Sequence, residues 1–391
     1  MDAFTFAGNP EIHFGPGIFS SLPGRIRVFG NKALILTGKT SLKQSGYHEY
    51  LEKELHKNKI AFHFGIVDGE PTPEWVDQTA ERHRHDKPDV VVGIGGGSVM
   101  DAGKAVSAMI PVNGSVLRFL EGIGDRAHPG ITLPFIAVPT SSGTGSEATK
   151  NAVLSRVDDN GFKKSLRHNN FIPEMALVDP ELTLSLPPHI TAACGMDALT
   201  QLLESFVSTQ ASPMTDALAR EGIAAAGEAL VPVSTDQGDN IGLRSKMSLA
   251  ALLSGITLAN AGLGTVHGFA SSIGGRFPIP HGVVCGTLMG AVTRFNIKKL
   301  LNKEPESAGL RKYAVASRLM FGNKKPDSDA RYAQWLAESL EEWTEMLKMP
   351  RLGEYGMNES DVDEIVASTG QKNNPVKLTN SELREILLSR L

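Results

Sequence analysis

The stretch DVVVGIGGGSVMDAGKAVSAMI, at residues 89–110, is the feature that most constrains the fold of this chain. In it, a β-branched apolar run ends at three consecutive glycines, and a segment with helical spacing follows. Other apolar runs occur at 32–38, 60–67 and 133–140, with helical patterns at 42–56 and 73–85 between them. Strands that alternate with helices in units of about 30 residues predict a parallel sheet with helices on both faces.

The second half of the chain has a different pattern. From Thr191 onward the segments are long, rich in alanine and leucine, and periodic at helical spacing. Pro187 and Pro188 stand just before this change, so we place a boundary near residue 185. A chain of 391 residues is expected to form two domains. We therefore predict an α/β domain at 1–185 and an all-helical domain at 186–391.

Composition excludes several classes of protein. The formal net charge of -4 gives no reason to expect nucleic acid as a partner. The two cysteines, Cys194 and Cys285, are far apart in the sequence, which fits a reducing compartment. The N-terminus has no basic segment before an apolar run, and no stretch approaches the roughly 20 apolar residues of a membrane helix. We expect a cytoplasmic protein that does not bind membranes.

Two glycine-rich turns are candidates for phosphate binding. In GIGGGSVMDAGK, at 93–104, backbone N–H groups at the start of a helix could approach an anion closely. The alternative is a plain tight turn in which Ser98 and Asp101 cap the helix. A second turn, PTSSGTGSE at 139–147, follows the next strand. Because both turns would lie at the carboxyl ends of neighbouring parallel strands, the pair predicts a nucleotide site.

Acidic and imidazole side chains in the second half suggest a metal site. Asp197 and Gln201, in CGMDALTQLLES, are four residues apart and would share one face of a helix. His267 and His281 lie in glycine-rich surroundings that allow close approach, and with Asp197 they could bind zinc or ferrous iron. The alternative is that both histidines are hydrogen-bonded core residues and that Asp197 is a carboxylate favoured by the helix dipole.

Six motifs occur here in an order that resembles the iron-containing alcohol dehydrogenases. They are GGGSVMDAGK, PTSSGTGSE, ALVDPELTLSLP, GMDALTQLLES, GLGTVHG and PHGVVCGTLM. The resemblance covers essentially the whole chain. It implies a dinucleotide-binding α/β domain and an all-helical domain, the architecture of dehydroquinate synthase-like proteins, with the active site in the cleft between them. It also implies a homodimer or a higher homo-oligomer.

The resemblance assigns site residues by position. For the cofactor it implies Gly95, Gly96, Gly97, Ser98 and Asp101 at the pyrophosphate turn, Thr140, Ser141, Thr144 and Ser146 at the second turn, Lys163 near the nicotinamide ribose, and Leu182 against the cofactor. For the metal it implies Asp197, Gln201, His267 and His281.

Two of the matched positions depart from the family pattern. A histidine is usual where this chain has Gln201, and a second histidine, near the substrate, is usual where it has Ser271. A neutral amide is a weaker ligand than imidazole, but three protein ligands still suffice for a catalytic metal. We expect iron or zinc, held more weakly than usual. Without a metal, His267 would have to stabilise the substrate oxyanion, and Ser271 could pass a proton only within a relay.

The turn TGKTSLKQSG, which follows the run at 32–38, bears on the choice of cofactor. The resemblance puts the adenosine ribose there, where a carboxylate would repel a 2′-phosphate. Gly38, Lys39 and Ser41 instead offer a cation, a hydroxyl and a helix start. We predict NADP(H) over NAD(H); the alternative is that Lys39 is only a solvated surface residue.

These observations predict an NAD(P)-dependent alcohol dehydrogenase or aldehyde reductase for small substrates. One alternative is a transhydrogenase-like oxidoreductase that keeps its nucleotide bound. Others are a relative of 3-dehydroquinate synthase and a nucleotide-binding protein whose metal site has decayed. Co-purified nucleotide and metal content would separate these alternatives.

Overall fold

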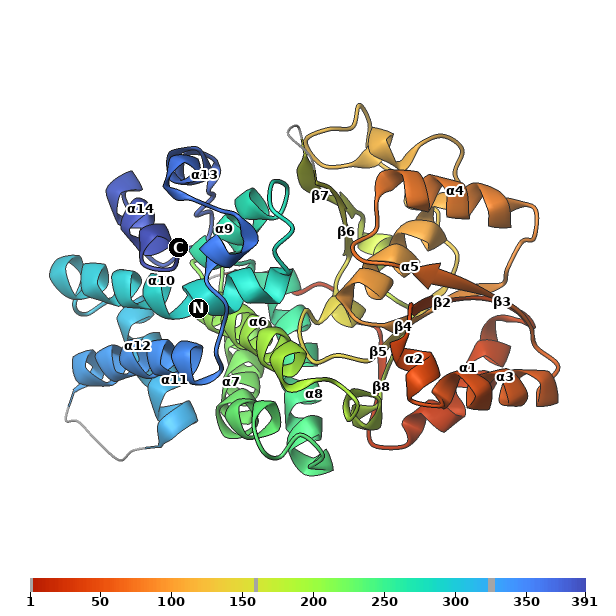
Figure 1. Ribbon diagram of the computed structural model, residues 1–391, viewed down its shortest axis with the longest axis horizontal. Coiled ribbons are helices and arrows are strands. Elements are labelled where there is room, and N and C mark those ends of the chain that lie inside the picture. The colour runs from red at the N-terminus through yellow and green to blue at the C-terminus, as the bar shows by residue number, and fades with distance from the viewer. Residues whose placement is uncertain (1–2, 158–160, 323–327) are drawn as a thin grey trace.

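The computed structural model describes residues 3–157, 161–322 and 328–391, and its N-terminal half is built on a six-stranded parallel sheet (Figure 1). The strand order is β1-β8-β5-β4-β2-β3. The strands are β1 (Glu11–Phe14), β2 (Lys32–Gly38), β3 (Ala61–Val67), β4 (Val90–Gly95), β5 (Phe135–Pro139) and β8 (Met175–Val178). The predicted parallel sheet is confirmed.

Helices cover both faces of this sheet, as predicted. They are α1 (Leu22–Phe29), α2 (Ser41–Gln44) and α3 (Tyr47–Lys57) on one face, and α4 (Pro73–Arg84) and α5 (Gly97–Met109) on the other. Successive side chains of β2 point to opposite faces. Leu34 therefore packs in a buried cluster with residues of α4 and α5, whereas Ile35 packs with residues of α1 and α3. The single helix expected at 42–56 is two helices, because Gly46 adopts a left-handed conformation (φ 77°) between them.

A hairpin that the sequence patterns did not predict stands beside the sheet. β6 (Asn151–Arg156) pairs antiparallel with β7 (Phe162–Arg167). Ala152, Leu154 and Leu166 anchor it in the same buried cluster as α5. The hairpin matters for the site because β7 carries Lys163.

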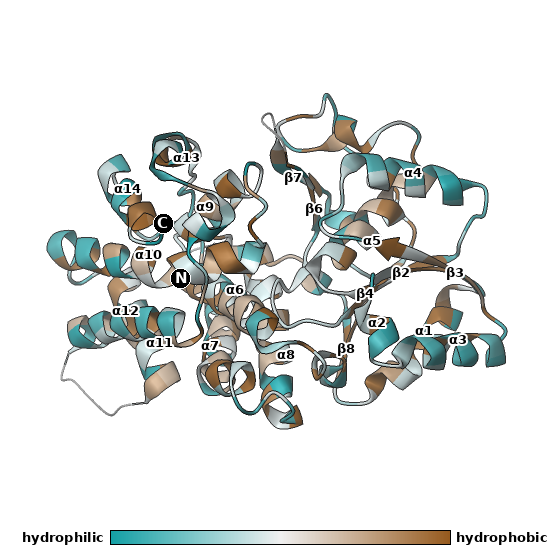
Figure 2. Ribbon diagram, viewed as in Figure 1, coloured by the Kyte–Doolittle hydropathy of each residue, from teal (hydrophilic) through white to brown (hydrophobic). Residues whose placement is uncertain are grey.

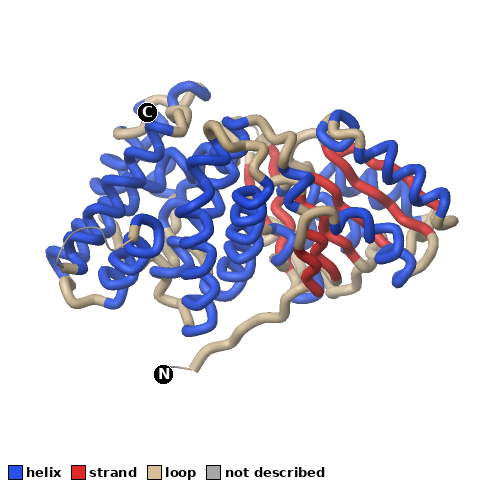
Figure 3. Tube along the Cα trace, turned by 90° about the horizontal axis from the view of Figure 1, so that it is seen from below, coloured by secondary structure: helices blue, strands red, loops and turns tan. Residues whose placement is uncertain are grey.

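The remainder of the chain is helical. The last strand is followed by a 3-10 turn, η5 (Pro180–Thr183), and α6 (Pro188–Val207) then begins, so the boundary placed near residue 185 falls in the connection. The further helices are α7 (Pro213–Ser234), α8 (Ile241–Ala261), α9 (Thr265–Ile273), α10 (His281–Lys303), α11 (Ala308–Phe321), α12 (Asp329–Met346), α13 (Val362–Ser368) and α14 (Asn380–Leu388). Figure 3 shows the helical part on one side of the molecule and the strands on the other.

The helical part has its own apolar core. α6 is buried along most of its length, and α7, α8 and α10 pack around it. The outer helices α11, α12 and α14 carry both hydrophobic and hydrophilic residues (Figure 2), and their apolar residues Leu310, Leu336 and Leu383 are buried in this core. Within the described ranges, no single helix has the length and apolar composition needed to cross a membrane; α8 and α9 meet those criteria only as a pair, bent by 96°.

Candidate functional site

A cleft of about 420 Å³ lies between the α/β part and the helical part. Its walls come from the turns that follow β3, β4 and β5, from the β6–β7 hairpin, and from α6, α8, α9, α10 and their connections. The lining residues are Gly69, Glu70, Pro71, Gly97, Ser98, Asp101, Thr144, Ser146, Thr149, Asn151, Val153, Lys163, Gln201, Leu258, Leu263, His267, Pro280 and His281. Both constellations predicted from the sequence therefore meet at one cleft.

The two glycine-rich turns pack directly against each other. β4 ends at Gly95 and α5 begins at Gly97, so the free N–H groups of the first turn of α5 lie at the carboxyl end of the sheet. Thr140 N donates a hydrogen bond to the carbonyl of Gly95 (2.9 Å). A Cβ at Gly97 would lie 2.8 Å from Thr144 Cγ2, so this approach requires glycine. Ser141 lies close as well, with its Oγ 3.2 Å from the position of a Cβ at Gly96.

A buried lysine ties the two turns together from beneath. Lys104 is 1 % exposed, and its Nζ donates to the carbonyl oxygen of Ser146 (2.9 Å), to Ser146 Oγ (2.6 Å) and to Thr149 Oγ1 (3.0 Å). Ser146 Oγ in turn donates to Asp101 Oδ1 (2.7 Å). Burial lowers the pKa of Lys104 and raises that of Asp101. Asp101 thus braces the second turn; the cap of α5 is Gly96, which provides no side-chain hydrogen bond.

The turn after β2 holds an ion pair. Lys39 Nζ donates to Asp68 Oδ2 at 2.9 Å, and both side chains are exposed. Asp68 directly follows β3, the strand that pairs with β2, so a carboxylate lies beside the turn even though the turn itself contains none. The hydrogen bond that Lys39 donates to Asp68 raises the pKa of Lys39.

Leu182 lies apart from the residues that line the cleft. It belongs to η5 and is 6 % exposed, in the apolar cluster beneath the sheet that also contains Leu177 of β8. Packing of the α/β core therefore accounts for this leucine.

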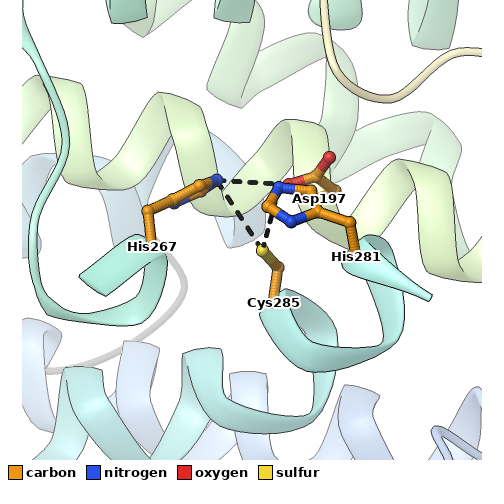
Figure 4. Close-up of side chains that lie close together, drawn as sticks. All are labelled: Asp197, His267, His281 and Cys285. Atoms are coloured by element: carbon orange, nitrogen blue, oxygen red, sulfur yellow. Dashed lines mark hydrogen bonds and ion pairs between the residues drawn. The ribbon is translucent and has the colours of Figure 1, made fainter. Parts of the chain in front are cut away.

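Four potential metal ligands converge on one point of the cleft wall (Figure 4). Asp197 comes from α6, His267 from α9, and His281 and Cys285 from α10. Their donor atoms all lie within 4.8 Å of one another. The distance from Asp197 Oδ1 is 3.3 Å to His267 Nε2 and 3.7 Å to His281 Nε2. The structure thus brings together three of the four predicted ligands and adds a cysteine that was not predicted.

This cluster fits a divalent cation. Asp197 is buried, and among the described residues no donor forms a hydrogen bond to its Oδ1, which points into the cluster. A buried carboxylate oxygen that accepts no hydrogen bond is costly, and a cation would satisfy it. The nitrogen, oxygen and sulfur donors are those that zinc and ferrous iron accept.

A glutamate outside the cluster fixes the orientation of His267. Glu204, seven residues after Asp197 on α6, accepts hydrogen bonds from His267 Nδ1 (2.8 Å) and from the backbone N–H of Val266 (2.7 Å). With its proton on Nδ1, His267 presents the Nε2 lone pair to the cluster. Sequence reasoning did not assign Glu204, although the spacing of Asp197, Gln201 and Glu204 would have put all three on one helical face.

The charged groups of the cluster perturb one another strongly. Burial would raise the pKa of Asp197, but the imidazoles of His281 and His267 hold it at about 2. Burial lowers the pKa of His281 to about 4 and raises that of Cys285 to about 12. Burial alone would also lower the pKa of His267, but Cys285, Asp197 and Glu204 raise it well above its usual value. A bound cation would displace the protons of its ligands.

Two residues predicted to take part in the site, Gln201 and Ser271, lie outside the metal-ligand cluster. Gln201 lines the cleft, but its Oε1 accepts a hydrogen bond from Ser254 Oγ of α8 (3.1 Å). Ser271, one turn after His267 on α9, is exposed and does not belong to the cleft lining. By contrast, Glu70 and Lys163 form an ion pair in the cleft wall, and Lys163 lowers the pKa of Glu70 against the opposing effect of burial.

Comparisons with known proteins match both parts of the chain to one family. Residues 9–180 match the family Iron-containing alcohol dehydrogenase, and residues 191–391 match its C-terminal family. The chain is 36% identical to 1-propanol dehydrogenase PduQ of Salmonella typhimurium, over 75% of this chain and 73% of that protein. It is 31% identical to alcohol dehydrogenase 4 of Schizosaccharomyces pombe, over 97% and 87%. The solved alcohol dehydrogenase of Oenococcus oeni matches with a TM-score of 0.88 at 29% identity, over 100% of both chains.

Proposed function

Because the chain belongs to the iron-containing alcohol dehydrogenase family, we propose that it interconverts small alcohols and their aldehydes or ketones, using NADP(H) and a divalent metal ion. Oxidation or reduction of alcohols and aldehydes follows from membership of the family. The observation that supports the finer proposal is the cleft itself, in which the cluster of Asp197, His267 and His281 faces the glycine-rich turn.

In the proposed reaction the helical part binds the metal and the substrate oxygen. Asp197, His267 and His281 would hold a divalent ion, which would supply a Lewis acid for that oxygen. Glu204 keeps the Nε2 lone pair of His267 aimed at the ion. Leu258 and Leu263 of the helical part give the cleft an apolar lining, which favours small substrates and excludes water.

The α/β part is proposed to bind the nucleotide. The turn of Gly95, Gly96, Gly97 and Ser98, at the N-terminus of α5, offers N–H groups to the pyrophosphate. Thr140, Ser141 and Thr144 line the facing turn, and Ser146 with Asp101 braces it. Lys163 lies in the cleft wall beside Glu70, which suits contact with the nicotinamide ribose. We leave Leu182 out of this proposal because it is buried in the apolar core beneath the sheet, and Ser271 because its side chain is exposed away from the metal-ligand cluster.

NADP(H) is proposed over NAD(H) because Lys39 can offer its ammonium group to a 2′-phosphate. At the same turn, Gly38 leaves room for the phosphate and Ser41 begins α2, whose first N–H groups could bind it. Asp68 competes for Lys39, so the 2′-phosphate would have to displace this exposed carboxylate. Both cysteines are free, which supports our expectation of a cytoplasmic enzyme; a homo-oligomer is proposed from the family.

The test uses the purified full-length chain. Metal content is measured after growth with added zinc and iron, and oxidation of NADPH and NADH is followed with a panel of small aldehydes and ketones. We expect bound metal, turnover of at least one carbonyl compound with NADPH preferred, and loss of activity on chelation. Absence of turnover with either cofactor after metal is restored would refute the proposed function. Turnover without added cofactor, from nucleotide that co-purifies, would favour the transhydrogenase alternative.

A further inference from the structure

Cys285 is placed as a ligand rather than as an ordinary core residue. It follows His281 by one turn of α10, so both side chains point to the same side of that helix. Its Sγ lies 3.7 Å from His281 Nε2 and 3.7 Å from His267 Nε2 (Figure 4). The sulfur thus contacts both imidazoles at the nitrogens that face Asp197.

These separations match those of donors that share one ion. Metal–donor bonds of about 2.1 Å for nitrogen or oxygen and about 2.3 Å for sulfur, in a tetrahedral zinc site, put nitrogen and oxygen about 3.4 Å apart and nitrogen and sulfur about 3.6 Å apart. The corresponding distances here are 3.3 and 3.7 Å from Asp197 Oδ1 to the two imidazoles, and 3.7 Å from Sγ to each imidazole. Little rearrangement would be needed in these four pairs for the donors to bind one ion, and the remaining two pairs lie within 4.8 Å.

The residue at position 201 does not serve as the fourth ligand. The resemblance expects a histidine there, but the chain has Gln201, whose amide oxygen accepts a hydrogen bond from Ser254 of α8. A neutral amide oxygen is also a weaker donor to zinc than a thiolate. The departure at position 201 therefore removes one nitrogen ligand, while Cys285 offers a sulfur ligand from another helix.

We propose that Cys285, as a thiolate, is the fourth protein ligand of the metal ion and replaces the histidine missing at position 201. On binding, the thiol proton leaves to solvent and a bond forms between Sγ and the ion. The resulting set of one carboxylate, two imidazoles and one thiolate suits a thiophilic divalent ion such as Zn²⁺. This inference rests on the proposed function in one respect, namely that the site holds a metal. With four protein ligands, the substrate oxygen of the proposed reaction would bind as a fifth ligand.

The test is spectroscopic and does not depend on catalysis. The full-length protein is loaded with Co²⁺, and its near-ultraviolet absorption is recorded together with metal affinity by chelator competition. We expect a sulfur-to-cobalt charge-transfer band in the wild type. Cys285→Ser should lose the band and at least about tenfold in affinity, since even loss of a partner that only orients a ligand typically costs that much. A double variant, Cys285→Ser with Gln201→His, should regain affinity without the band.

Cys194→Ser is the matched control. Cys194 lies on α6 against Gly143 of the second glycine-rich turn, and the ligand group found in the described residues does not include it. This variant should keep both the band and the affinity. A wild type that binds Co²⁺ without the band, a Cys285→Ser protein that retains it, or a wild type that binds no metal would overturn the inference. Carbonyl reduction measured on the same samples separates the two proposals. Turnover without the band would refute the cysteine ligand but not the proposed function, and the band without turnover would refute the proposed function but not the cysteine ligand.

Discussion

Replacing Glu204 by glutamine tests how the protein controls one ligand of the cluster. The carboxylate accepts the Nδ1–H of His267 at 2.8 Å and the N–H of Val266 at 2.7 Å. If the amide oxygen of glutamine keeps the bond to Val266, its NH₂ group faces Nδ1. Two donors cannot bond to each other, so His267 would move its proton to Nε2 and lose the lone pair that it presents to the metal.

The magnitude follows from the bond that is lost. A hydrogen bond to a charged group contributes about 1.5–3 kcal/mol. Since about 1.4 kcal/mol corresponds to a factor of ten, metal affinity should fall by about 10- to 150-fold in Glu204→Gln. Glu204→Asp retains the charge and should lose less. Chelator competition measures the affinity, and NADPH binding by fluorescence checks that the α/β part is intact. A Glu204→Gln affinity within about twofold of wild type would refute the reasoning.

Three further predictions concern the α/β part. Burial raises the pKa of Glu147 to about 7 from 4.5, so ionised Glu147 destabilises the folded protein by an amount that is absent below pH 4.5, grows as the pH rises to 7, and reaches about 3 kcal/mol. Glu147→Gln should remove this loss of unfolding free energy between pH 5 and pH 8, measured by urea unfolding. An equal loss in the variant and the wild type would contradict the prediction. Gly97→Ala should raise the NADPH KM severalfold because the new Cβ meets Thr144, an effect that an unchanged KM would exclude. Lys39→Ala should raise the KM for NADPH by about tenfold and leave the KM for NADH nearly unchanged, whereas Asp68→Asn, which frees Lys39, should lower the KM for NADPH. If each variant changed both KM values equally, the proposed preference for NADP(H) would lose its basis.

The parts of the fold predicted from sequence are those with strong local signals. The run at 32–38 became β2 with the same bounds because its apolar residues are buried on both faces and a glycine ends it. β1 was not predicted, since it is an edge strand with mostly exposed side chains. β7 was missed because FKKSLR has no clear alternation, and only its pairing with β6 makes it a strand.

The site was predictable to the extent that its residues stand in motifs. Asp197, His267 and His281 were identified, and the structure brings them together. Cys285 was overlooked because a cysteine in an apolar segment ordinarily fills a core, and contacts of α10 with α6 and α9 are what bring it to the cluster. Asp68 was overlooked for a related reason: the carboxylate comes from the neighbouring strand, and strand pairing is not visible in a local pattern.

The division of the cleft between two parts of the chain has a consequence for how the enzyme can diversify. The proposed metal ligands all belong to α6, α9 and α10, whereas the proposed nucleotide turns all follow strands of the sheet. A substitution in the turn after β2, which contributes no residue to the cleft lining, therefore need not disturb the ion, and its energetic effect should add to that of a ligand change. Selection can therefore act on the preferred nucleotide and on the metal ion as independent traits. The proposed exchange of histidine for cysteine among the ligands changes the metal site alone.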